Sequence, residues 1–191
     1  MKVKIRSSIT NRNLPYRCTE GFALSYYHEI LGQEARKGKY QDIVFSDRLV
    51  AESIDKIKRY LEEINIPTNQ FVVVPIPSNR RPGLVSSFAE KVARGIGAGY
   101  VEILAKKMNE PEQKTMINSR LQEQNVRDYL YIQQDPLIEL SNYHILLVDD
   151  FVDSGWTFAV AADIIGSRYQ CLSIIPFALS IIPFALSITG K

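Results

Sequence analysis

The chain has 191 residues, of which 46% are hydrophobic and 23% are charged, and its formal net charge is +2. These values suit one globular domain, and a charge so close to zero excludes a global field that would attract nucleic acid. Any site for an anion must therefore come from the local placement of cations. The two cysteines, Cys18 and Cys171, provide neither a disulfide framework nor a close pair of zinc ligands, so we expect a cytoplasmic protein.

Residues 1–45 are polar, with scattered aromatic side chains and no sustained periodicity, and we expect them to form a small N-terminal hood or extension. An amphipathic helix is predicted to follow, because Ser46 can cap it and apolar residues then recur at steps of four and three. These apolar residues are Val50, Ile54, Ile57, Leu61 and Ile64. Residues 65–69 contain a proline between two asparagines and are predicted to end the helix.

Residues 71–76 and 144–148 are largely apolar runs with the length of strands. Because they lack polar alternation, we expect both strands to be covered on both faces, as in parallel sheets. Further helix-like or strand-like patterns lie at residues 84–96, 100–105, 129–132 and 156–165. The alternation predicts an α/β core over residues 46–191, with a mostly parallel, Rossmann-like sheet flanked by helices. In such sheets ligands bind at the carboxyl ends of the strands.

Residues 106–127 form the longest polar stretch of the chain. A polar segment of this length inside a compact domain is typical of a functional loop such as an active-site lid. A solvated, charged loop is the alternative, although Lys106, Lys107 and Lys114 could reach phosphates if the segment closes.

The heptapeptide SIIPFAL occurs twice in tandem, at residues 173–179 and 180–186. The surrounding stretch has no charge, but it is short for a membrane span and contains two prolines, Pro176 and Pro183. We therefore expect a buried last strand within residues 171–187, and no membrane anchor.

The segment at residues 145–158 reads ILLVDDFVDSGWTF and combines a buried strand with a short turn into a helix. Asp149 and Asp150 are expected where the strand leaves the core, and two adjacent carboxylates can accept hydrogen bonds from vicinal ribose hydroxyls. Backbone N–H groups that open a helix favour an anion, and Gly155 would let the backbone approach it. The residues predicted to surround a phosphate are Asp153, Ser154, Gly155, Trp156 and Thr157. A strand that ends in acids before a serine cap is the simpler alternative.

This string resembles the phosphoribosyl pyrophosphate (PRPP) motif of type I phosphoribosyltransferases, in which two acids and a loop rich in serine or threonine follow apolar residues. The resemblance implies the type I phosphoribosyltransferase fold, ribose contacts for Asp149 and Asp150, and a 5-phosphate loop at residues 153–157. It also implies a catalytic role for Asp153, which would face the base and assist proton transfer. Trp156 departs from the small or flexible residue common at its position and could crowd the site. Mg²⁺ would enter with PRPP, held mainly by the substrate.

A second anion site is predicted after the strand at residues 71–76, where the sequence continues PSNRRPG. This turn resembles the pyrophosphate loop of the same family, and arginine binds phosphate oxygens in a bidentate manner. The predicted binding residues are Ser78, Asn79, Arg80 and Arg81. Surface arginines in an ordinary turn are the alternative.

A narrower resemblance covers most of residues 14–187. GKYQDIVFSDRLV, PSNRRPGLV, LLVDDFVDSGWTF and PFALS, with Gln113, Arg120 and Asn125, are similar in order to the phosphoribosyltransferase-like domain found in some RecQ-type DNA helicase proteins. ComF-type competence proteins share parts of this pattern. The chain contains no G-x4-G-K-[ST] nucleotide loop and lacks the cysteine cluster of the ComF proteins, so a DNA-processing protein partner is implied by resemblance alone.

Two functions follow from these patterns. In the first, a nitrogenous base attacks PRPP and pyrophosphate leaves, through a transition state of oxocarbenium character. In the second, the same pocket senses PRPP or a nucleotide without turnover, while serving a DNA-transaction partner. A DNA-binding module has little support, because no basic helix or stacking platform is present. The expected partners are PRPP or a nucleotide, a nucleobase and a second copy of the chain, with no membrane among them.

Overall fold

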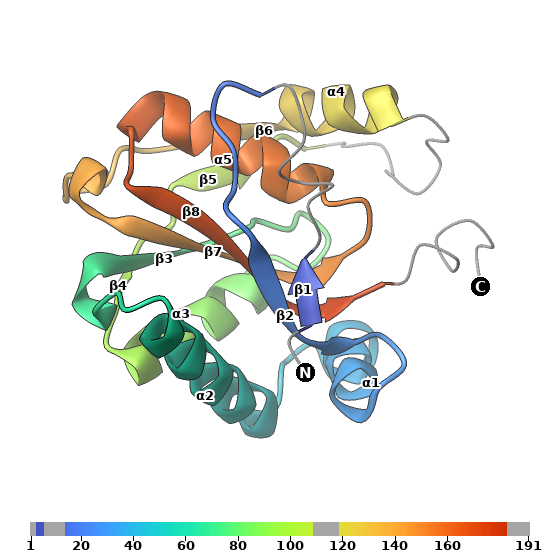
Figure 1. Cartoon of the computed structure of the whole chain (residues 1–191). Helices are drawn as coiled ribbons and strands as arrows, with labels where there is room; N and C mark the ends of the chain where they lie inside the picture. Colours follow the sequence, from blue (N-terminus) through green and yellow to red (C-terminus); the bar gives the residue numbers. More distant parts are fainter. Residues whose placement is uncertain (1–2, 6–13, 109–118, 183–191) are drawn as a thin grey trace.

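A central sheet dominates the computed structural model, which describes residues 3–5, 14–108 and 119–182 (Figure 1). Its strands are β1 (Val3–Ile5), β2 (Gly21–Tyr26), β3 (Phe71–Pro75), β4 (Gly99–Tyr100), β7 (His144–Val152) and β8 (Ser173–Ile181). They lie in the order β1-β2-β8-β7-β3-β4. Pairing is parallel except at β1, which runs antiparallel to β2 at one edge. The mostly parallel α/β sheet predicted from the sequence is confirmed.

Helices cover both faces of this sheet (Figure 1). The helices on one face are α1 (Ile30–Lys37), α2 (Asp47–Glu63) and α3 (Leu84–Ile96). The opposite face carries α4 (Ser119–Tyr129) and α5 (Trp156–Tyr169), beside a small antiparallel sheet of β5 (Leu104–Lys106) and β6 (Leu130–Ile132). Short 3₁₀ turns, η2 (Thr68–Gln70) and η4 (Leu140–Asn142), lead into β3 and β7.

The central strands divide their side chains between two hydrophobic cores. In β7, Leu146 and Val148 pack with α2 and α3, whereas Ile145 and Leu147 pack with α5. All four side chains are fully buried. Successive residues of a strand point to opposite faces, so a strand covered on both sides must be apolar at every position. This burial explains the unbroken apolar runs in the sequence.

The two predicted helices on the first face form as expected. Ser46 caps α2, because its hydroxyl accepts a hydrogen bond from the backbone N–H of Leu49 over 3.2 Å. Helix α3 ends at Gly97, whose φ of 74° is the left-handed conformation that favours glycine. Both helices therefore begin or end on the local signals that the sequence carries.

Residues 21–26, which were expected in an N-terminal hood, form β2 within the central sheet. This strand pairs in parallel with β8, and Phe22 and Leu24 lie in the core with α2 and α3. Gly21 permits the close approach, because a Cβ atom there would lie 2.4 Å from the carbonyl oxygen of Pro176. Two segments of residues 1–45, β1 and β2, thus belong to the same sheet as the strands of the core. The apolar run of β2 is short and lies between polar flanks, so it does not stand out in the sequence.

Two predicted strands have different bounds from those expected. The candidate at residues 100–105 divides into β4, on the edge of the central sheet, and β5, in the small sheet. Strand β7 continues beyond Val148 to Val152, because β8 supplies a partner along that length. Asp149 and Asp150 therefore lie on the strand and not past its end. The sequence conceals this extension because the two acids interrupt the apolar pattern.

The polar segment predicted as a lid is partly helical. Residues 109–118 lie outside the described residues, and α4 occupies the end of the segment. An ion pair holds α4 on α5: Arg127 Nη2 lies 2.9 Å from Asp163 Oδ2. Asp163 Oδ1 also accepts a hydrogen bond of 3.1 Å from the backbone N–H of Tyr16. One buried carboxylate therefore joins the N-terminal segment, α4 and α5.

The first copy of the repeated heptapeptide forms most of β8, as expected for a buried last strand. The second copy falls largely within residues 183–191, outside the described residues. Among the helices that the structure describes, none has the length and apolar character needed to cross a membrane.

Asp163→Asn removes the ion pair that joins α4 to α5. We expect the free energy of unfolding to decrease by about 2 kcal/mol, because the carboxylate is buried and Arg127 would keep only Glu123 as a charged partner. Chemical denaturation measures this change. Asp135→Asn is the matched control, since its ion pair with Arg168 is 2.8 Å long but exposed on both sides and should change stability little. Equal effects of the two variants would contradict this account of the anchor.

Candidate functional site

The carboxyl ends of β3 and β7 meet at one edge of the sheet. The two strands pair in parallel, with Pro75 opposite Val148, and the backbone N–H of Ile76 donates to the carbonyl oxygen of Val148 over 2.8 Å. The turn that follows β3 and the two acids of β7 therefore start at neighbouring positions on the same edge of the sheet. Parallel sheets bind ligands at this edge, and both strands after which the sequence predicts an anion site end there.

Asp149 and Asp150 are tied to each other through the backbone. The N–H of Asp150 donates to Asp149 Oδ1 over 2.8 Å, and the N–H of Phe151 donates to Asp150 Oδ1 over 2.7 Å. Asp150 is buried, with 5% of its surface exposed, whereas Asp149 is partly exposed. These hydrogen bonds fix the orientation of both carboxyl groups.

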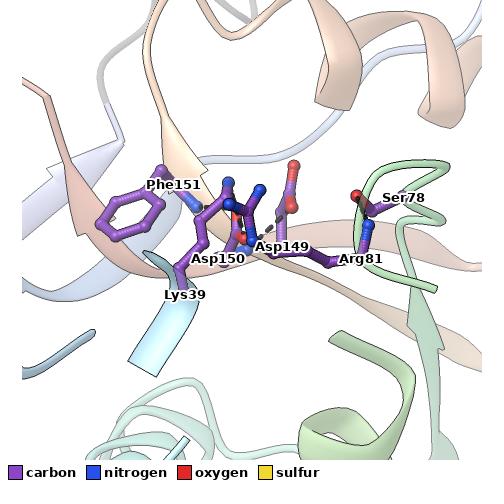
Figure 2. Close-up of polar contacts among 6 residues, drawn as sticks. All are labelled: Lys39, Ser78, Arg81, Asp149, Asp150 and Phe151. Carbon is purple, nitrogen blue, oxygen red and sulfur yellow. Dashed lines mark hydrogen bonds and ion pairs between the residues drawn. The ribbon is translucent and has the colours of Figure 1, made fainter. Parts of the chain in front are cut away.

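A lysine from the N-terminal half of the chain pairs with Asp150. Lys39 lies in η1 (Gly38–Asp42), a turn of π-helix after α1, and its Nζ is 2.8 Å from Oδ1 and 2.7 Å from Oδ2 of Asp150. The same Nζ lies 4.9 Å from the ring centroid of Phe151. Figure 2 shows Lys39 meeting Asp150 beside this ring. Asp150 and Phe151, which are adjacent in the sequence, thus both contact the ammonium group of Lys39.

The environment of Asp149 favours its protonated form. Loss of hydration, and then the charge of the adjacent Asp150, raise the pKa of Asp149 to about 7. The positive charge of Lys39 and the hydrogen bond from the backbone of Asp150 oppose this shift. A carboxyl group that holds its proton near neutral pH can donate a hydrogen bond to a ligand oxygen as well as accept one.

The loop between β7 and α5 has the backbone expected of an anion site. Gly155 has a φ of 78°, a left-handed conformation that favours glycine, and it precedes the first turn of α5. Ser154 and Thr157 are partly exposed beside it, and Asp153 is exposed. The free N–H groups and dipole of a helix N-terminus favour a bound anion. The loop residues predicted from the sequence therefore lie together at this helix end.

Trp156 does not lie as its position in the motif suggested. Its side chain is 5% exposed and packs in the core between the sheet and α5. The large ring therefore points into the hydrophobic core and away from the solvent-exposed side of the loop. Trp156 can contribute its backbone to an anion site without crowding it.

The turn after β3 places one of its two arginines towards the acids. The guanidinium carbon of Arg81 lies 4.8 Å from the ring centroid of Tyr40, and in Figure 2 the Arg81 side chain extends from the turn towards Asp149 and Asp150. Ser78 Oγ accepts a hydrogen bond from the backbone N–H of Arg81 over 3.3 Å. Asn79 and Arg80 are exposed in the same turn.

Asn79 has a structural partner outside this turn. Its amide nitrogen donates to the carbonyl oxygen of Lys107 over 2.7 Å. This hydrogen bond joins the turn after β3 to the segment that leaves β5. Asn79 thus holds the turn in place, a role for which the sequence motif gave no indication.

Sequence reasoning gave no role to the residues of η1. Lys39 and Tyr40 belong to the segment GKYQD, and a lysine beside a tyrosine in a polar stretch indicates no particular chemistry. Their importance comes from tertiary structure, which brings them from the N-terminal half of the chain to Asp150 and Arg81. Only conservation of residues 38–42 among homologous sequences would have pointed to Lys39 and Tyr40.

Within the described residues, no group of three or more histidine, cysteine, aspartate or glutamate side chains is placed to hold a metal ion. The site nevertheless fits a magnesium ion that arrives with its ligand. Mg²⁺ is usually bound by one or two carboxylates together with the phosphates of a substrate and with water. Asp149, partly exposed at this edge, can supply such a carboxylate once it has released its proton.

Comparison with known proteins supports the fold and its family. The chain matches the family described as "Phosphoribosyl transferase domain" over residues 45–181. The adenine phosphoribosyltransferase from Leishmania donovani is 14% identical, with a TM-score of 0.50, and the match covers 89% of this chain and 75% of that one. Comparison with curated proteins finds no match.

Two other solved structures are similar at lower TM-scores. The purine phosphoribosyltransferase from Pyrococcus horikoshii Ot3 is 13% identical, with a TM-score of 0.42 and coverage of 72% of this chain and 73% of that one. The hypoxanthine phosphoribosyltransferase from Staphylococcus aureus is 12% identical, with a TM-score of 0.46 and coverage of 72% and 75%. Neither likeness identifies a substrate for this chain.

The raised pKa of Asp149 makes stability depend on pH. Between the ordinary value of 3.8 and about 7, the folded protein keeps a proton that the unfolded chain has released, so the free energy of unfolding falls as pH rises through this window. Asp149→Asn removes the charge that is costly above pH 7. We expect this variant to raise Tm at pH 8 and to change it less at pH 4, as measured by thermal unfolding.

Asp55→Asn, at an exposed acid of α2, is the control and should change Tm equally at both pH values. If Asp149→Asn also shifted Tm by the same amount at pH 4 and pH 8, the carboxyl group would not be titrating in this window.

Proposed function

This chain belongs to the phosphoribosyltransferase family, and we propose that it binds PRPP and transfers the phosphoribosyl group between pyrophosphate and a nitrogenous base. One observation carries the proposal: the acids of β7, the N-terminal end of α5 and the turn after β3 share one edge of the parallel sheet. A phosphoribosyl ligand needs acceptors for ribose hydroxyls between two sites for phosphate. The presence of these three groups at one edge supports the proposal.

Each part of PRPP has a complementary group in this proposal. The 5-phosphate binds the backbone N–H groups at residues 153–157, with Ser154 and Thr157 as further donors. Asp149 and Asp150 accept hydrogen bonds from the ribose hydroxyls. The pyrophosphate binds the turn at residues 78–81, where Arg80 and Arg81 supply positive charge.

The transfer breaks the bond between the anomeric carbon and the pyrophosphate oxygen, and the electron pair leaves with pyrophosphate. A ring nitrogen of the base forms the new bond to the same carbon, through a transition state of oxocarbenium character. Arg80 and Arg81 stabilise the charge that develops on the leaving group. Asp153, exposed beside the loop, accepts the proton that the base nitrogen releases. Magnesium bound with the substrate would offset part of the pyrophosphate charge.

A binding module without turnover is the second candidate. The observation that favours it is the ion pair of Asp150 with Lys39, which already occupies one of the acids proposed to contact ribose. Such a module would sense PRPP or a nucleotide. An association with DNA processing would rest on the resemblance to the domain found with RecQ-type helicases.

Calorimetric titration of PRPP with magnesium tests the site. We expect saturable binding to the unaltered protein and a loss of affinity of at least about 100-fold in the double variant Asp149→Asn, Asp150→Asn, because hydrogen bonds to charged acceptors contribute about 1.5–3 kcal/mol each. The matched control is the double variant Asp47→Asn, Asp55→Asn, which changes two exposed acids of α2. A folded, unaltered protein that bound no PRPP would sink the proposal.

Asp153→Asn separates an enzyme from a binding module. In an enzyme this variant should bind PRPP normally but lose roughly 100-fold or more in kcat, since general acid–base catalysis contributes about that much. The measurement is pyrophosphate release in the presence of a panel of nucleobases. If no base supports pyrophosphate release by the unaltered protein although PRPP binds, the binding module is the better description.

A further inference from the structure

The turn η1 connects the two halves of the proposed ligand site. Its Lys39 pairs with Asp150 on β7, and its Tyr40 lies against the guanidinium of Arg81 in the turn after β3. Lys39 Nζ itself is 5.8 Å from the centroid of the Tyr40 ring. One aromatic ring therefore has an ammonium and a guanidinium beside it, and each cation belongs to a different part of the site.

The backbone of η1 is held in a costly conformation. Ile43, which ends the turn, has a φ of 54°, and left-handed geometry is unusual for a β-branched residue. The N–H of Val44 donates to the carbonyl oxygen of Gly38 over 3.1 Å and closes the turn. A Cβ atom on Gly38 would lie 2.6 Å from the carbonyl oxygen of Val44. Backbone strain of this kind is concentrated at functional sites, where the surrounding structure maintains it.

Lys39 and Arg81 both retain hydrogen-bonding capacity. An ammonium group has three N–H donors, and the two contacts of Lys39 with Asp150 use at most two of them. Arg81 Nε is buried and has no hydrogen-bond partner among the described residues. A buried donor without a partner is costly, so an anionic ligand that reached it would satisfy it.

We propose that Lys39 binds the pyrophosphate group of the ligand and that Tyr40 positions Arg81 to bind the same group. The inference rests on the proposed function, because it requires the site at this edge to take a phosphoribosyl ligand. It adds a third segment, η1 from the N-terminal part of the chain, to the acids of β7 and the turn after β3. Lys39 then has two partners, the carboxylate of Asp150 and a phosphate oxygen.

The other role for Lys39 is to compensate the charge of Asp150 and nothing more. In that case removing Lys39 would lower the affinity for an anion only because the unpaired carboxylate of Asp150 repels it. Removing both charges would then restore binding. Direct contact predicts a different result, because the lost N–H donor cannot be replaced by neutralising Asp150. The two roles are therefore separable with a double-mutant cycle.

The probe is magnesium pyrophosphate, titrated by calorimetry into the unaltered protein and into Lys39→Met, Asp150→Asn and the double variant. Pyrophosphate has no ribose, so Asp150→Asn should not weaken its binding. We expect Lys39→Met and the double variant both to bind roughly tenfold to 100-fold more weakly, the usual effect of losing one charge-assisted hydrogen bond. Pyrophosphate affinity restored in the double variant, or unchanged or tighter in Lys39→Met, would overturn the proposal.

Lys37→Met is the matched control, because Lys37 Nζ is paired with Asp42 Oδ2 over 3.5 Å on the exposed side of the same segment. Its affinity for pyrophosphate should equal that of the unaltered protein. Thermal unfolding checks that each variant folds. If Lys39→Met does not fold, the double variant, which removes both charges of the buried pair, decides the question.

Tyr40 has its own pair of variants. Tyr40→Phe keeps the ring against Arg81 and should bind pyrophosphate as the unaltered protein does, whereas Tyr40→Leu should bind several-fold more weakly. Equal binding by these two variants would remove the positioning role of the ring.

A protein that bound neither PRPP nor pyrophosphate would refute the proposed function as a whole. PRPP binding with normal pyrophosphate affinity in Lys39→Met would refute this inference alone.

Discussion

Parallel pairing of β3, β7 and β8 fixes the place of each group in the candidate site. In the register of these strands Val74 lies opposite Leu147, which lies opposite Pro176, and both faces of the sheet are buried. A slip of one residue would turn every side chain to the other core, where it does not fit, so the register is strongly specified. Because the register is fixed, the turn after β3 and the acids of β7 meet at one edge without needing a direct contact.

Much of this arrangement follows from local sequence signals. The apolar runs before Ile76 and Asp149 are long enough, and uniform enough, to indicate strands buried on both faces. The cap at Ser46 and the left-handed Gly97 mark helix ends by backbone chemistry that depends on few neighbours. The positions of the acids, the anion loop and the arginine turn could be predicted because each immediately follows such a strand.

The remaining features depend on contacts between distant segments. Strand β2 shows only a short apolar run, and its place in the sheet comes from pairing with β8, which the missing Cβ of Gly21 permits beside Pro176. Trp156 lies in a motif of ligand-binding residues, yet a core on the other side of the loop takes its ring. Lys39 is far from Asp150 in the sequence, so its role becomes visible only when the fold brings the two together.

The sequence of strand β8 is repeated seven residues further along the chain. Its nine residues read SIIPFALSI, and the same nine letters also run from residue 180 to residue 188. A shift of seven residues would therefore present identical side chains to β2 and β7, with the same parity of faces and the same proline in the ladder. The loop after α5 would grow by seven residues, at an entropic cost of about 1 kcal/mol. Residues 180–188 thus repeat the complete side-chain pattern of β8.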